Sequence, residues 1–263
     1  MPTTITFGPL TVETFTALVA AAALLGLAVV TGTARRPGDS RLLPGLDVGL
    51  GGVVGGVIGA RLLHVLLWWP YFRDHLSEVF KLGAGGLSWH GALYGGLIGL
   101  WLAARWQSTQ RRAVSLRPVR DALALAWPLG LMAGWGACWA AACGYGAEVW
   151  TLADFPTWAV SEAPDVFGFV APRYNTQLFG VGFGAALLLV IGLLTLSGRL
   201  RDYRLWLALL LTGTGMFVLG FWRGDGLAGP LPGLTWDQVL DLSVIAVSAG
   251  FIVAERITAA RHS

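Results

Sequence analysis

The sequence predicts an all-α integral membrane protein in which seven transmembrane helices form one bundle. Composition, the length of the apolar runs and the distribution of positive charge predict it. Of the 263 residues, 55% are hydrophobic and only 13% are charged, whereas a soluble domain carries about 25% charged residues. The mean hydropathy is +0.65. This composition excludes a disordered chain, a coiled coil and a nucleic-acid-binding module. It also disfavours an ordinary soluble globule, because a protein of this size cannot bury so much apolar surface in water.

Seven apolar runs approach or exceed the roughly 20 helical residues that a bilayer requires. They cover residues 13–33, 45–69, 87–106, 120–143, 177–197, 204–222 and 236–255. We expect residues 1–263 to form a single membrane domain. The longest connecting segment, 144–176, is rich in Trp and Phe, which favour the headgroup region. It is therefore expected to form a cap on the outer membrane surface, with a plain loop as the alternative.

The positive charges predict the orientation of the bundle. The first, third and fifth loops and the C-terminal tail hold 13 Lys and Arg residues, whereas the even loops hold four: Arg73, Lys81, Arg173 and Arg223. The positive-inside rule then places the N-terminus outside and the C-terminus in the cytoplasm. The first 34 residues contain no Lys or Arg, so no cleavable signal peptide is expected.

Glycines at intervals of four mark the second and third runs. They are Gly51, Gly52, Gly55, Gly56 and Gly59 in the second, and Gly91, Gly95 and Gly99 in the third. Small residues at this spacing let membrane helices approach closely. We therefore expect these glycines to pack the bundle.

Several polar residues gather at the predicted outer end of the helices. Ionisable groups at membrane depth cost about 2.5–3.5 kcal/mol each, so they indicate a site. Guanidinium groups bind phosphate in a fork, and His can transfer a proton near neutral pH. An outward-facing site for an anionic lipid is expected, although single Arg residues could instead reach lipid phosphates and a single His could be a packing residue. The residues are Arg61, His64, His90, Cys138, Cys143, Arg173 and Arg223.

The two cysteines lie five positions apart at the end of the fourth run. In a regular helix Cys138 and Cys143 would lie on different faces, too far apart for a disulfide. A bridge would require the helix to end between them. The sequence therefore predicts two small buried thiols.

Five blocks in order resemble the prolipoprotein diacylglyceryl transferases. GGLSWHGALYGGLIG (85–99) resembles the family's His-Gly-Gly segment, and IGARLLHVL (58–66) its Gly-Ala-Arg-Leu segment. The other three blocks are PLGLMAGWGACWAAACGYG (128–146), PRYNTQLFG (172–180) and FVLGFWRGDG (217–226). The resemblance spans nearly the whole chain and implies seven helices with the N-terminus outside.

The resemblance also implies an activity. It implies the transfer of a diacylglyceryl group from phosphatidylglycerol to the lipobox cysteine of an exported prolipoprotein, with glycerol phosphate as leaving group and without metal or cofactor. It implies a multi-pass protein of the bacterial plasma (inner) membrane, with its active face on the outer leaflet. His90 matches the histidine of the family's motif and is expected to be the catalytic residue, which handles the proton or orients the reacting groups. Arg61, Arg223 and Arg173 are expected to bind the lipid phosphate, and the motif-associated residues are His64, Gly91, Cys138, Cys143 and Gly146.

Some positions differ from the family's pattern, and they leave alternatives open. Positions where the family has Tyr, Arg, Asn or Glu are occupied by Phe15, Trp135, Cys138, Cys143, Gly180, Met216 and Gly220. A homologue with altered or lost catalysis, which binds an anionic phospholipid or a partner protein, is the first alternative. A small-solute transporter that uses Asp47, Asp121 and Asp241 is the second.

Overall fold

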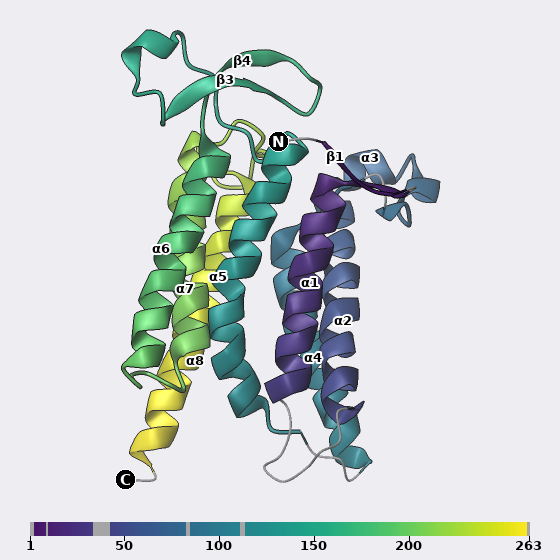
Figure 1. Ribbon diagram of the computed structural model, residues 1–263, viewed down its shortest axis with the longest axis vertical. Coiled ribbons are helices and arrows are strands. Elements are labelled where there is room, and N and C mark those ends of the chain that lie inside the picture. Colours follow the sequence, from purple (N-terminus) through teal and green to yellow (C-terminus); the bar gives the residue numbers. More distant parts are fainter. Residues whose placement is uncertain (1–2, 9, 34–42, 83–84, 111–113, 262–263) are drawn as a thin grey trace. The chain divides into compact units, whose positions relative to one another are not determined.

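The computed structural model describes residues 3–8, 10–33, 43–82, 85–110 and 114–261 (Figure 1). The chain divides into two compact units. The α2–α4 unit comprises Leu25–Leu123, and the α5–α8 unit comprises Met1–Leu24 with Ala124–Ser263. The boundaries between the units fall within helices α1 and α5. The single-domain expectation stays a prediction. The first loop and part of the third, which carry many of the arginines counted above, lie outside the described residues.

All seven predicted runs are helical. Among the described residues, six of these helices are long and apolar enough to cross a membrane, and the chain is therefore a multi-pass, mainly α-helical membrane protein. The 21-residue α4 is not among the six; its last turns carry Arg105, Gln107 and Ser108. The helices are α1 (Thr14–Thr33), α2 (Leu43–Leu67), α4 (Trp89–Thr109), α5 (Leu116–Ala140), α6 (Thr176–Leu196), α7 (Arg204–Leu219) and α8 (Trp236–Ala260).

Three helices end two or three residues earlier than predicted, whereas α4 and α8 end later, at Thr109 and Ala260. α2 ends at Leu67 and is followed by the short α3 (Trp69–Phe72), whose first turn contains Pro70, a residue suited to opening a helix. α5 ends three residues early, at Ala140. α7 changes at Leu219 into the 3₁₀ turn η4 (Gly220–Trp222).

Two short antiparallel hairpins are present that the sequence did not predict. β1 (Thr4–Phe7) pairs with β2 (Leu10–Glu13), and β3 (Val160–Pro164) pairs with β4 (Val170–Tyr174). Strands of four or five residues are at the lower limit of length at which alternation of apolar and polar side chains can be recognised in a sequence. The β3–β4 hairpin shows that the 144–176 segment is more than a plain loop.

Glycines join α2 to α4 along their length. A Cβ atom on any of six glycines would lie within 3 Å of the backbone of the opposite helix, so the two helices approach as closely as their backbones allow. The packing prediction is confirmed for these residues. They are Gly51, Gly55 and Gly59 on α2, and Gly91, Gly95 and Gly99 on α4. The apolar core of the α2–α4 unit is made by Val30, Val48, Ala104 and Val119.

In the α5–α8 unit, α7 contacts the other long helices. The Thr212 hydroxyl accepts a hydrogen bond from Trp127 Nε1 on α5 at 2.9 Å. Gly213 leaves room for the backbone of α8, since a Cβ atom there would lie 3.0 Å from the Asp241 carbonyl oxygen. The Trp206 ring also stacks on Phe251 of α8, with centroids 4.0 Å apart. These contacts hold the first half and the middle of α7 against α5 and α8, in the helix that leads to the Arg223 segment.

Candidate active site

The guanidinium of Arg61, near the end of α2, holds the loop that precedes α4. It donates four hydrogen bonds to carbonyl oxygens: Nε to Val79 at 2.8 Å, Nη2 to Glu78 at 2.6 Å, and Nη1 to Gly85 at 2.7 Å and Gly86 at 3.0 Å. Within the described part of the chain, Arg61 forms no ion pair with a carboxylate. Its side chain thus orders the loop, while none of the acids that the structure describes neutralises its positive charge.

His64 joins Arg61 at the same loop. Its ring centroid lies 5.8 Å from that of Phe72, and the same Phe72 ring lies 5.2 Å from Arg61 Cζ. The loop backbone passes close by at Gly86, where a Cβ atom would lie 2.5 Å from His64 Nε2 and 2.8 Å from Arg61 Nη1. Gly86 also has a φ of +72°, which glycine adopts without strain. The structure therefore brings the two predicted side chains together around a glycine.

His90 lies in the first turn of α4 and is completely buried. Its ring centroid lies 3.9 Å from that of Trp89. The Ser88 amide donates to the Ala60 carbonyl at 3.0 Å, so the start of α4 is fixed beside the residue that precedes Arg61. The next residue, Gly91, belongs to the α2–α4 seam. His90 and Arg61 consequently lie at the same end of this helix pair.

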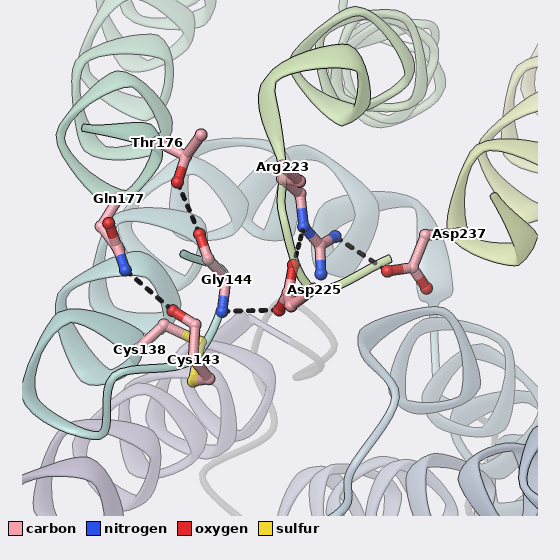
Figure 2. The surroundings of a disulfide bond; sticks show 8 residues. All are labelled: Cys138, Cys143, Gly144, Thr176, Gln177, Arg223, Asp225 and Asp237. Carbon is pink, nitrogen blue, oxygen red and sulfur yellow. Dashed lines mark hydrogen bonds and ion pairs between the residues drawn. A yellow bond between two sulfur atoms is a disulfide. The ribbon is translucent and has the colours of Figure 1, made fainter. Parts of the chain in front are cut away.

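Cys138 and Cys143 form a disulfide bond, and the prediction of two free thiols is therefore wrong (Figure 2). α5 ends at Ala140, between the two cysteines, which is the condition that a bridge requires. Ala142 adopts a φ of +53°, and the Cys143 amide donates to the Cys138 carbonyl at 3.0 Å. The resulting turn brings the two Cα atoms to 4.6 Å, within the range for a disulfide.

The residue after the disulfide, Gly144, connects three elements. Its amide donates to Asp225 Oδ2 at 2.8 Å, and its carbonyl accepts from Thr176 Oγ1 at 2.6 Å. Gln177 Nε2 donates to the Cys143 carbonyl at 3.1 Å. The turn is thus fastened both to the first turn of α6 and to the segment that carries Arg223 (Figure 2).

Arg223 is oriented by two carboxylates. Its Nε donates to Asp225 Oδ1 at 2.9 Å, and its Nη1 lies 2.8 Å from Asp237 Oδ2 on α8. Burial disfavours the charged guanidinium, but Asp225 and Asp237 outweigh this effect, so the pKa of Arg223 lies above its ordinary value. The side chain is 19% exposed. Nη2 takes part in neither interaction (Figure 2), so within the described part of the chain its two donors remain for another acceptor.

Gly146 permits the close approach of two chain segments. A Cβ atom there would overlap the Tyr174 backbone, and a Cβ atom on Gly224 would lie 2.7 Å from the Gly146 carbonyl oxygen. Gly146 and Arg223 are also paired as an antiparallel bridge. The glycine that closes the predicted motif therefore supports the backbone of Arg223.

Arg173, on β4, ties together the 144–176 segment. Its side chain is 4% exposed, and its Nη2 lies 2.8 Å from Glu148 Oε1 and 3.6 Å from Asp165 Oδ2. Its Cζ lies 4.9 Å from the centre of the Tyr145 ring. Burial first, and the charges of Asp225 and Asp165 next, raise the pKa of the Tyr145 hydroxyl. Arg173 is therefore neutralised by carboxylates of its own segment.

The acidic partners of these arginines were not predicted from the sequence. The missed residues that contact Arg223 and Arg173 are Asp225, Asp237, Glu148 and Asp165. Only Asp225, two positions after Arg223, had a local signal. Of the predicted site residues, Arg61, His64, His90 and Gly91 lie in the α2–α4 unit, and Cys138, Cys143, Gly146, Arg173 and Arg223 lie in the α5–α8 unit.

Comparisons with known proteins give the family. Residues 2–254 match the family model for prolipoprotein diacylglyceryl transferase. A phosphatidylglycerol–prolipoprotein diacylglyceryl transferase of Aromatoleum aromaticum is 34% identical over 224 residues, which is 80% of this chain and 77% of the relative. The protein of the same name from an Azoarcus species is 30% identical, over 78% of this chain and 76% of its own length. The chain thus belongs to the prolipoprotein diacylglyceryl transferase family.

Proposed function

We propose that this protein transfers a diacylglyceryl group from phosphatidylglycerol to the cysteine thiol of a prolipoprotein. The observation that carries the proposal is the family match over residues 2–254, together with relatives that bear this activity in their names. In this reaction the cysteine sulfur forms a bond to the glyceryl carbon, the bond from that carbon to the phosphate oxygen breaks, and glycerol phosphate leaves with the electron pair. The proton of the thiol must be taken up during the step.

In this reaction, Arg223 and Arg61 are proposed to supply positive charge for the lipid phosphate. Arg223 is supported by its orientation between two carboxylates and by the donors of Nη2. Arg61 is supported by its charge, which no acid neutralises among the described residues. Preorganised donors of this kind stabilise charge that develops on a leaving group. Arg173 is a weaker phosphate ligand, because Glu148 and Asp165 already neutralise it.

His90 is proposed as the group that handles the proton or orients the reacting groups. Its position at the end of the α2–α4 pair where Arg61 also lies supports this role. Complete burial favours orientation over direct contact with bulk solvent. His64, in contact with Phe72 and the Gly86 loop, is proposed to shape the same region.

The protein belongs to a bacterial inner membrane and is multi-pass, and we propose seven crossings with the N-terminus outside and the active face on the outer leaflet. The count of positive charges in the loops supports this orientation. The disulfide at the end of α5 supports it independently, because disulfides persist in the bacterial periplasm and are rare in the cytosol. Residues 144–176 would then cap the outer surface. Reporter fusions at both termini of the full chain test this topology.

The transferase proposal is tested by mass spectrometry of a lipobox peptide incubated with purified protein and phosphatidylglycerol. A mass increase of one diacylglyceryl group, lost in His90→Ala, is the expected result. A folded protein that binds phosphatidylglycerol without any mass shift would overturn the transferase proposal. That outcome would indicate a homologue that binds lipid without turnover.

A further inference from the structure

We propose that the Cys138–Cys143 disulfide is a positioning element for Arg223, acting through Gly144 and Asp225. The inference rests on the proposed function, in which Arg223 contacts the lipid phosphate. It assigns a role in the reaction to a bond that is not itself among the groups proposed to bind the phosphate or to handle the proton.

Asp225 connects the disulfide turn to the guanidinium. Its two oxygens serve different partners: Oδ2 accepts from the Gly144 amide at 2.8 Å, and Oδ1 accepts from Arg223 Nε at 2.9 Å. A carboxylate bound at both oxygens cannot rotate freely. The direction of the Gly144 amide therefore sets the position of the oxygen that holds Arg223 (Figure 2).

The disulfide sets the direction of that amide. Gly144 follows Cys143 directly, and the turn between the cysteines contains Ala142 at a φ of +53°. This left-handed conformation is unfavourable for a residue with a Cβ atom, so a flexible chain would leave it. The covalent bond and the hydrogen bond from the Cys143 amide to the Cys138 carbonyl hold the turn closed.

Other contacts would keep the protein folded without the disulfide. Thr176 and Gln177 remain on the first turn of α6 as hydrogen-bond donors for the carbonyls of a turn that has shifted. Asp237 on α8 still contacts Nη1 of Arg223. Loss of the disulfide should therefore loosen one of the two carboxylates that orient Arg223 while the helices remain in place. Small displacements of a positioning group can lower rates by about a hundredfold, and we expect about a tenfold lower kcat/KM here, where one carboxylate remains.

The test is a comparison of activity and stability in three variants of the full chain. They are the double variant Cys138→Ser/Cys143→Ser, the single variant Asp225→Asn, and the triple variant that combines them. If the disulfide acts through Asp225, the triple variant loses no more activity than Asp225→Asn, whereas its thermal midpoint falls below that of either parent. Activity losses that multiply in the triple variant would show that the disulfide acts elsewhere and would overturn the proposal.

Reduction of the folded wild-type protein supplies the matched control. A phosphine reductant converts the disulfide into two thiols and is itself oxidised to the phosphine oxide. Activity of the wild type should fall to the level of the double cysteine variant, and the double variant should not respond. An unchanged activity after complete reduction, verified by thiol alkylation, contradicts the proposal.

Hydrogen exchange separates this inference from the proposed function. Peptides that cover residues 141–147 report on the Gly144 amide, and they should exchange faster in the double cysteine variant and in Asp225→Asn than in the wild type. A wild type without transferase activity would refute the proposed function, yet the exchange comparison would still test the coupling. Unchanged exchange in the cysteine variant would show that the disulfide does not hold the Gly144–Asp225 contact.

Discussion

The indole ring of Trp135 occupies the space beside Gly180 that a side chain would otherwise fill. A Cβ atom on Gly180 would overlap the ring, and the edge of the same ring lies 2.8 Å from where a Cβ atom on Gly144 would be. Trp135 and Gly180 are two of the positions at which the chain differs from the family pattern that it resembles. Their contact shows that these two differences fit each other sterically, between α5 and α6.

Substitution of Gly180 by Ala should therefore destabilise the protein. The methyl group would force the Trp135 ring to move, and overpacking of this kind costs about 1–3 kcal/mol. Gly182, also on α6, is the matched control, because no other part of its unit lies within 4 Å of its Cβ position. Thermal unfolding in detergent should give a lower midpoint for Gly180→Ala and an unchanged or higher midpoint for Gly182→Ala. Equal midpoints would show that Trp135 adjusts without cost.

The seam between α2 and α4 gives a second prediction. A Cβ atom on Gly95 would overlap the Gly55 carbonyl, whereas one on the adjacent Gly96 would lie 3.5 Å from the Gly52 carbonyl oxygen, an ordinary contact. Gly95→Ala should separate the helices and cost about 1–3 kcal/mol, whereas Gly96→Ala should be tolerated. The thermal midpoint and the yield of folded protein measure both variants. If Gly96→Ala proves as harmful as Gly95→Ala, helix approach is not the cause.

The helices could be predicted because each long run of apolar residues has one favourable solution in a bilayer, an α-helix whose backbone groups bond within the segment. The glycines of α2 and α4 were predictable for a similar reason, since their spacing of four places them on one face. The two hairpins were not predicted. Each strand has only four or five residues, and it pairs only with the neighbouring strand of the same hairpin.

The arginines proposed for the site could be picked out in the sequence, and their role stays a prediction, whereas most of the groups that contact them could not be picked out. Arg61, Arg173 and Arg223 are conspicuous because charges are rare in this chain. Arg61 contacts backbone carbonyls, and Arg173 contacts acids that lie up to 25 residues away along the chain. Neither kind of contact produces a recognisable pattern of residues next to the arginine in the sequence. The disulfide was missed because helix periodicity continues to Cys143 in the sequence, whereas the helix ends at Ala140.

Arg61→Lys should lower transferase activity by about tenfold or more, although the charge is kept. A lysine has three donors on one nitrogen and cannot reach the carbonyls of Glu78, Val79, Gly85 and Gly86 together. The loop before α4 would lose its anchor. Arg105→Lys is the control, since Arg105 is an exposed residue of α4 that contacts Trp101. Steady-state kinetics with phosphatidylglycerol measure the effect. Full activity in Arg61→Lys would show that charge alone is required.

The carboxylate of Asp165 binds two backbone amides at the tip of the β3–β4 hairpin. Asp165 Oδ1 accepts from the amides of Phe167 and Phe169 at 2.9 and 3.0 Å, and its Oδ2 lies 3.6 Å from Arg173 Nη2. Asp165→Ala removes both amide contacts, and each hydrogen bond contributes about 1 kcal/mol. The tip, which exposes both phenylalanines, should then be cleaved several-fold faster by chymotrypsin, because local opening governs cleavage.

Asp165→Asn distinguishes the turn from the ion pair. The amide side chain keeps one carbonyl oxygen and can still accept from Phe167 and Phe169, but it removes the negative charge near Arg173. Because Glu148 remains 2.8 Å from Arg173 Nη2, the neutralisation of this arginine should persist. Chymotrypsin should therefore cleave Asp165→Asn at nearly the wild-type rate. Rapid cleavage of both variants would instead mean that the ion pair with Arg173, and not the two amide contacts, holds the hairpin tip closed.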